Sequence, residues 1–192
     1  DHIGGLAPFL FGTKHAVEMQ SRTKPLRIFG AEGLKQTLDI YAEANQFSTL
    51  GHPFPIEIIE VDPLRTFQIL ADLEAVSFDT PHTVESRAIL LKDASEKTLV
   101  FTADTGFTKA LGAFANKVDL FLMECSFVKN KKVESHLELS EAMYLAKYSK
   151  AKKVVLTHLY PEWDEVNFHE EVEKFSPHCE VIEARDGLRI DI

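Results

Sequence analysis

The chain has 192 residues, of which 45% are apolar, and it carries a net charge of −9 at pH 7. This length suits a single domain, and no apolar run approaches the roughly 18 residues that a transmembrane helix needs. The excess of acidic residues argues against an extensive nucleic-acid-binding surface, since phosphate contacts require Lys and Arg. It does not exclude a local basic rim.

The cysteines and the first residue bear on the compartment and on the completeness of the chain. Cys125 and Cys179 are too few for a disulfide framework, and we interpret them as buried free thiols in a reducing, cytoplasmic setting. The chain begins with Asp1 rather than Met, and it shows no basic start followed by an apolar stretch, as a signal peptide would. We therefore expect a processed, trimmed or incomplete chain.

The first part of the chain predicts two helices around one short strand. Residues 5–20 place apolar side chains at helical spacing, with Pro8 acceptable in a first turn. Residues 26–29 predict a strand. Residues 32–44 predict an amphipathic helix, because the apolar side chains fall on one side.

The middle of the chain is strand-like. Three segments are rich in Ile, Val and Phe, namely residues 56–61, 66–70 and 74–79. Residues 87–92 and 98–102 flank an Asp-Ala-Ser-Glu turn, which predicts a hairpin.

The last part alternates strands with helices. Strands are expected at residues 119–124, 153–157, 180–183 and 188–192, and helices at residues 139–150 and 164–175. Ser140 is the expected N-cap of the first of these helices, with Glu141 in its first turn. Antiparallel pieces mixed with βα units predict a layered α/β sandwich, with residues 1–192 as a single domain.

Four short segments place an Asp or a His where a predicted strand ends and a loop begins. They are residues 1–5 (Asp-His-Ile-Gly-Gly), 80–82 (Thr-Pro-His), 101–106 (Phe-Thr-Ala-Asp-Thr-Gly) and 156–159 (Leu-Thr-His-Leu). Imidazole and carboxylate groups suit zinc and, among harder metals, manganese. Each segment alone is a weak signal, because such a His is more often a capping or core residue and such an Asp a turn residue. The order of all four together favours a metal site.

These segments resemble the motifs of the metallo-β-lactamase superfamily, specifically its ribonuclease Z-like and phosphodiesterase-like members. The family pattern is His-x-His-x-Asp-His-x-Gly-Gly, then a His before a strand, an Asp in a Gly/Ala-Asp-Thr turn, and a Thr-His after a buried strand. Asp1 and His2 match the tail of the first motif, and His82, Asp104 and His158 match the other three in order.

Two further stretches extend the resemblance over nearly the whole chain. Residues 124–127 (Glu-Cys-Ser-Phe) are similar to a Glu-Ala-Thr-Phe segment of the family, and His136 resembles the histidine of a loop that leads into a helix. The resemblance implies a four-layer αββα sandwich with two facing sheets and outer helices. The first strands of that fold, and the two histidines that precede Asp1 in the motif, do not occur in this chain.

The resemblance also implies two divalent metal ions in the complete protein, with zinc expected first and manganese or iron as alternatives. Carried over, Asp104 bridges both ions, while Asp1, His2 and His158 hold the second. His82 holds the first together with the two preceding histidines of the family motif.

The same resemblance implies roles in catalysis for two residues. A metal-activated water attacks the phosphorus, and Asp1 orients this water or accepts its proton. His136 stabilises the transition state or protonates the leaving oxygen. The alternative for His136 is a solvated loop histidine.

The implied function is that of a metal-dependent hydrolase, first of all a phosphodiesterase or a ribonuclease Z-like nuclease acting on a small phosphodiester or on RNA. Only 21 residues separate His82 from Asp104, where ribonuclease Z proper carries a long tRNA-gripping arm, and this favours a smaller phosphodiester or another small ester. The alternatives are hydrolysis of a carboxylic ester, thioester or lactam on the same metal site, or a degenerate, non-enzymatic interaction module. No membrane partner is expected, and a homodimer is left open.

Overall fold

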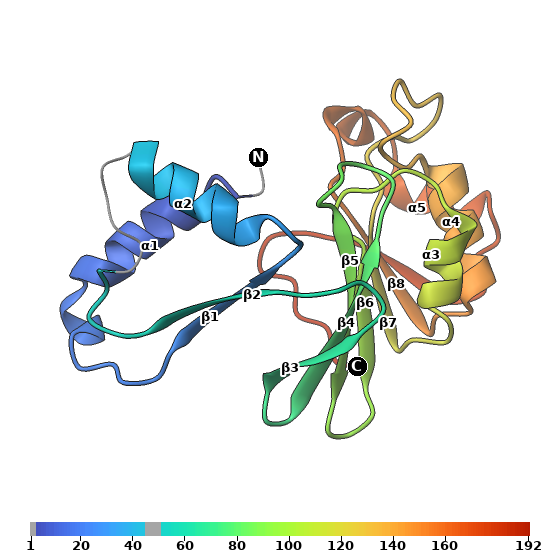
Figure 1. Cartoon of the computed structure of the whole chain (residues 1–192). Coiled ribbons are helices and arrows are strands. Elements are labelled where there is room, and N and C mark those ends of the chain that lie inside the picture. The colour runs from blue at the N-terminus through green and yellow to red at the C-terminus, as the bar shows by residue number, and fades with distance from the viewer. Residues whose placement is uncertain (1–2, 45–50) are drawn as a thin grey trace. The chain divides into compact units, whose positions relative to one another are not determined.

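A computed structural model describes residues 3–44 and 51–192 of the chain (Figure 1). The chain divides into two compact units, Asp1–Asp62 and Pro63–Ile192. That residues 1–192 form a single domain therefore stays a prediction. Among the described residues, no helix combines the length and the apolar character needed to cross a membrane.

The described residues of the first unit form two α-helices, one 3-10 helix and a two-stranded parallel sheet. Its elements are α1 (Leu6–His15), the 3-10 helix η1 (Val17–Met19), β1 (Leu26–Gly30), α2 (Leu34–Ala44) and β2 (Ile56–Glu60). Glu60 Oε1 accepts hydrogen bonds of 3.0 Å from the backbone N–H groups of Gly33 and Lys35. A carboxylate satisfies unpaired N–H groups at a helix start and suits its positive end, so the end of β2 caps α2.

The second unit is built on a seven-stranded mixed sheet, whose spatial order follows the chain. The strands are β3 (Thr66–Leu70), β4 (Leu73–Asp79), β5 (Arg87–Asp93), β6 (Thr98–Phe101), β7 (Leu120–Glu124), β8 (Lys153–Thr157) and β9 (Glu180–Glu183). Strands β3 to β6 pair antiparallel, and β6 to β9 pair parallel. The helices are α3 (Lys109–Phe114), α4 (Leu139–Ser149), the 3-10 helix η2 (Pro161–Glu165) and α5 (Phe168–Glu173). Figure 1 shows α3 and α4 side by side on one side of this sheet.

The core of the second unit joins the central strands to the helices. Strand β7 is buried along almost its whole length, as parallel strands covered by helices usually are. Phe121 and Met123 of β7 are fully buried in one cluster with Leu145 of α4 and Leu156 of β8. Burial of each such side chain stabilises the fold by about 1.5–3 kcal/mol, so the ends of these strands form a rigid platform.

The strand directions bring four loops to one edge of the sheet. Strands β4 and β6 are both antiparallel to β5, and β7 and β8 run parallel to β6. The C-terminal ends of β4, β6, β7 and β8 therefore share an edge, which is where open α/β sheets bind ligands. The loops that follow these ends contain His82, Asp104, Ser126 and His158.

Most of the predicted elements of the second unit are confirmed. The strands at residues 66–70, 153–157 and 180–183 have the predicted bounds, and the hairpin is β5–β6. The presence of two sheets with helices confirms the mixed α/β class. The strand expected at residues 188–192 is wrong, because these residues form neither helix nor strand. Helix α3 was not predicted, since its six residues give too short an apolar pattern.

Two helix termini also differ from the expectations. Helix α4 begins at Leu139 as predicted, but its N-cap is Glu138 rather than Ser140, and Glu138 forms a capping box with Glu141. The helix expected at residues 164–175 is divided into η2 and α5. The division follows from Asn167, whose side chain accepts from the backbone N–H of Glu170 and so starts a new helix.

Candidate metal centre

Three of the predicted ligands meet at the shared edge of the second sheet. Asp104 Oδ2 lies 3.9 Å from His82 Nε2 and 3.6 Å from His158 Nε2. Asp104 is 8% exposed, so it is mostly buried rather than on the open surface. The two remaining predicted ligands, Asp1 and His2, lie outside the described residues.

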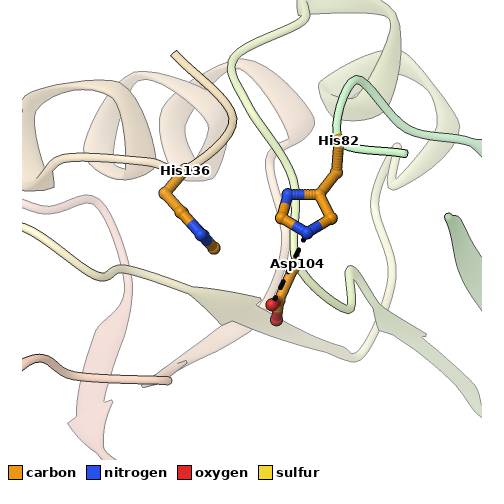
Figure 2. A group of neighbouring side chains, drawn as sticks. All are labelled: His82, Asp104 and His136. Carbon is orange, nitrogen blue, oxygen red and sulfur yellow. Dashed lines mark ion pairs between the residues drawn. The ribbon is translucent and has the colours of Figure 1, made fainter. Parts of the chain in front are cut away.

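The His82 ring is oriented by a backbone carbonyl. Its Nδ1 lies 3.0 Å from the carbonyl oxygen of Ser135. A carbonyl oxygen can only accept, so Nδ1 carries the hydrogen and Nε2 presents a lone pair toward Asp104. Figure 2 shows this nitrogen directed at the Asp104 carboxylate.

The His158 ring is oriented in the same sense by a hydroxyl group. Its Nδ1 lies 2.8 Å from Ser126 Oγ, and Ser126 Oγ donates its own hydrogen to Glu124 Oε2 at 2.9 Å. Ser126 therefore accepts from Nδ1–H, and Nε2 of His158 keeps its lone pair. His158 has a φ of 56°, a left-handed backbone that non-glycine residues adopt rarely and mostly where the surroundings impose it.

The buried carboxylate of Glu124 organises the loops around the site. Its Oε1 accepts from the backbone N–H of Thr105 and from His136 Nδ1, both at 2.8 Å. Its Oε2 accepts from the hydroxyl and N–H of Ser126 and from the N–H of Leu137. Glu124 is 1% exposed, and these five donors satisfy the charge that burial would otherwise disfavour. Glu124 thus connects the loop that follows β6 to both ends of the loop between β7 and α4.

His136 stands between the other two histidines. Its ring centroid is 4.9 Å from that of His82 and 5.2 Å from that of His158. Nδ1 donates to Glu124, and Nε2 lies 3.5 Å from the hydroxyl oxygen of Tyr160, its second partner. His136 is 8% exposed, so the alternative of a solvated loop histidine is wrong.

One glycine lets the loops of this site approach one another. Gly106 donates its N–H to the carbonyl oxygen of Pro81 at 2.8 Å. A Cβ atom at this position would collide with the backbone carbonyl oxygens of Glu134 and Pro81. Only glycine allows the loops that carry His82 and Asp104 to close together in this way.

The described donor set fits a divalent transition metal. Ligand atoms of His82, Asp104 and His136 lie within 4.8 Å of one another, as do those of Glu124, His136 and His158. Neutral imidazole Nε2 atoms and a carboxylate are ligands of zinc and related metals, and ligating histidines usually donate Nδ1–H to a second group. Glu124 is an orienting residue rather than a ligand, because five donors already occupy its two oxygen atoms.

The cysteines contribute no ligand to this group. Cys125 is a fully buried free thiol, as predicted, and burial raises its pKa well above the ordinary value, so the thiol stays neutral. Cys179 is also free but only half-buried.

A cavity of about 600 Å³ lies beside His136. Its walls include Phe127, Lys132, Ser135 and Tyr160. This volume is typical of sites for small organic molecules. The cavity therefore gives a substrate room next to His136.

Comparison with known proteins assigns the family. The family described as "Beta-lactamase superfamily domain" matches residues 1–159. The chain belongs to this family. The resemblance inferred from the motifs around His82, Asp104 and His158 is thereby confirmed.

Two curated relatives agree with this assignment. The chain is 27% identical over 162 residues to the Bacillus subtilis protein named "Probable metallo-hydrolase YhfI", a match that covers 83% of this chain and 62% of the relative. It is 30% identical over 108 residues to "Ribonuclease Z" of Shouchella clausii, covering 54% of this chain and 35% of the relative. The matches thus span less than two thirds of either relative's length.

Solved structures share the fold. The metallo-β-lactamase fold protein YhfI from Bacillus subtilis superposes with a TM-score of 0.73 at 23% identity, covering 97% of this chain and 71% of that chain. The short form of human tRNase Z superposes with a TM-score of 0.62 at 17% identity, covering 91% and 71%. The predicted metallo-β-lactamase fold class is therefore confirmed.

Sequence reasoning did not single out two residues that support this site. Glu124 and Ser126 entered the prediction only as part of a resembling stretch, whereas both orient site histidines. One signal in the sequence could have indicated Glu124: it ends an apolar strand (Leu-Phe-Leu-Met-Glu). A carboxylate buried at such a position needs hydrogen-bond partners, which predicts neighbouring donors.

Proposed function

We propose that the protein is a metal-dependent hydrolase of phosphodiester bonds, a phosphodiesterase or ribonuclease Z-like nuclease. The observation that carries the proposal is the convergence of His82, Asp104 and His158, with both imidazole Nε2 atoms facing one carboxylate. Orientation of each ring through its Nδ1–H is the arrangement expected of metal ligands.

The proposed ligands divide between two sites. Asp104 would contribute to both sites, His158 would hold the second ion with Asp1 and His2, and His82 would hold the first. Divalent cations held there, zinc first among them, supply a water nucleophile near neutral pH and stabilise charge on the phosphoryl oxygens. Asp1 orients this water or accepts its proton.

His136 is the proposed proton donor to the leaving oxygen. Glu124 holds His136 through Nδ1, which leaves Nε2 as the nitrogen that delivers a proton to the leaving oxygen. Tyr160 lies within 3.5 Å of this nitrogen and can accept or return a proton through its hydroxyl group.

Two observations bear on the substrate: the first supports a phosphodiester, and the second limits its size. One relative is named "Ribonuclease Z". The short interval between His82 and Asp104 is filled by the β5–β6 hairpin, without an additional arm. This favours a small phosphodiester or another small ester over folded tRNA. A cytoplasmic location and a homodimer remain proposals, the first supported by the free thiols.

The test is a hydrolysis assay of the metal-loaded protein on bis(p-nitrophenyl) phosphate, with a p-nitrophenyl carboxylic ester, a thioester and a lactam as competing substrate classes. We expect phosphodiester hydrolysis that requires added zinc or manganese and is lost in Asp104→Ala. The variant His169→Ala serves as a control, because His169 is an exposed residue of α5. Preference for a carboxylic ester, thioester or lactam would contradict the proposed substrate class. A metal-binding protein without any hydrolysis would contradict enzymatic function.

A further inference from the structure

A row of exposed aromatic rings runs along α4, outside the candidate metal centre. Phe107, Tyr144 and Tyr148 are 40%, 45% and 41% exposed, although large aromatic side chains usually bury most of their surface. The Phe107 and Tyr144 ring centroids lie 5.5 Å apart. The Tyr144 and Tyr148 rings, one helical turn apart, lie 6.0 Å apart and only 9° from parallel.

A cavity of about 600 Å³ lies beside these rings, between α3 and α4. Its walls include Ala113, Asn116, Tyr144 and Tyr148. Gly112 of α3 makes room for this arrangement, because a Cβ atom there would lie 2.8 Å from Cδ1 of Tyr148. The groove therefore results from the close packing of α3 against α4.

The surroundings of the groove are basic, although the whole chain carries a charge of −9. Lys147 and Lys150 line it, and Lys109 Nζ lies 4.8 Å from the Tyr148 ring centroid. No Asp or Glu occurs in residues 105–118 or 142–153, the segments that contain α3 and most of α4. This part of the surface is the local basic rim that the composition left open.

We propose that this groove binds single-stranded RNA. Exposed, nearly parallel rings offer platforms on which bases stack, and flanking lysines contact the phosphates, which is the recurring design of single-strand binding surfaces. Phe107 follows Asp104 by three residues in the same loop, so at most about 10 Å of extended chain separates the start of the row from the candidate metal centre. An RNA strand with one phosphodiester at the metal centre then continues over Phe107, Tyr144 and Tyr148.

The charges favour RNA over a second copy of the chain. A two-fold interface brings the same surface of both copies together, so Lys147 and Lys150 would face like charges without a carboxylate in the groove to offset them. A polyanion instead releases counterions when it binds these lysines.

The proposal names the substrate class of the proposed nuclease, but binding can be tested separately from hydrolysis. All binding variants are made in an Asp104→Ala background, which prevents cleavage. Fluorescence anisotropy then measures the affinity for a labelled oligouridylate of about 12 nucleotides, within the usual range for single-strand sites. Hydrolysis by the unmodified protein is assayed independently on bis(p-nitrophenyl) phosphate, so failure of one proposal leaves the other standing.

We expect Tyr148→Ala to weaken RNA binding about fivefold or more, because each base–ring stack contributes at least this factor. Tyr148→Phe keeps the ring and should bind as the parent does. Lys147→Ala with Lys150→Ala should lower the slope of log affinity against log salt by about 1.4, since each phosphate contact on a single strand contributes about 0.7. The matched control is Lys97→Ala with Lys174→Ala, two lysines outside the groove.

Two results would overturn the proposal. One is RNA affinity that is absent, or that Tyr148→Ala and the Lys147/Lys150 pair leave unchanged. The other is a dimer in light scattering that Tyr148→Ala converts to a monomer, which would make the groove a subunit interface. Thermal unfolding of each variant shows that a loss of binding does not reflect a loss of the fold.

Discussion

Ser126 Oγ lies 2.8 Å from Nδ1 of His158, and it must accept the hydrogen of that nitrogen because its own hydrogen goes to Glu124. The Ser126 hydroxyl group thus connects the buried Glu124 carboxylate to the His158 ring and fixes the orientation of that ring. The other nitrogen of the ring points at Asp104. The same carboxylate orients His136 directly. Two histidines of the site therefore depend on one residue that contacts neither metal nor substrate in the proposed mechanism.

Replacing Ser126 tests this dependence. Ser126→Ala removes the acceptor for His158 Nδ1–H, so we expect zinc affinity to fall by about 10- to 100-fold. Ser126→Thr keeps the hydroxyl group and should retain most of the affinity. Competition with a chromogenic zinc chelator measures both variants. Equal affinities for Ser126→Ala and the unmodified protein would show that His158 does not bind metal through the orientation seen here.

The division of ligands between two sites predicts unequal effects of two histidine substitutions. The proposed second site has four ligands, Asp1, His2, Asp104 and His158, whereas the proposed first site takes His82 and Asp104 from the described residues. His158→Ala should therefore remove nearly all bound metal, and His82→Ala should remove less. Elemental analysis after dialysis counts the metal, with His169→Ala as the control. Two full metal equivalents in the unmodified chain, or a larger loss in His82→Ala, would show that the division is wrong.

The proposed proton donor can be separated from a metal ligand by the choice of leaving group. Nitrophenolate leaves without protonation, whereas an alkoxide or ribose oxygen requires a proton. His136→Ala should thus hydrolyse bis(p-nitrophenyl) phosphate at nearly the normal kcat but lose about 10²- to 10⁴-fold on a dinucleotide. Bound metal should stay unchanged in this variant. An equal loss on both substrates, together with lost metal, would identify His136 as a ligand.

The sequence was sufficient to predict that three of the candidate ligands meet, because each of these three follows a strand with a clear apolar or alternating pattern. His82, Asp104 and His158 come together as the motif order indicates. It was insufficient for Glu124 and Ser126, since the pairing of the buried carboxylate depends on Thr105 in the β6–α3 loop and on His136 near the far end of the β7–α4 loop, 19 and 12 residues away in the chain. The end of the chain was also predicted wrongly, because alternation at residues 188–192 cannot show whether a neighbouring strand is available for pairing.

A second buried carboxylate makes a prediction about acid stability rather than catalysis. Asp119 accepts from Lys152 Nζ at 2.8 Å and from the N–H and hydroxyl group of Thr98 at 2.9 Å, which ties β6 and β8 to the start of β7. The hydrogen bond from Lys152, followed by that from the Thr98 backbone, lowers the pKa of Asp119 from 3.8 to about 2. A carboxyl group whose pKa is lower in the folded state contributes stability above its unfolded pKa and loses it as the pH falls toward the folded pKa.

Asp119→Asn should therefore lower the free energy of unfolding by about 2 kcal/mol at neutral pH, and the difference should shrink below about pH 3.8. Urea unfolding across this pH range measures the effect, with Asp72→Asn, at an exposed position in the β3–β4 turn, as the control. A difference between Asp119→Asn and the unmodified protein that stays constant down to about pH 3 would mean that the Lys152 and Thr98 contacts do not favour the ionised carboxylate.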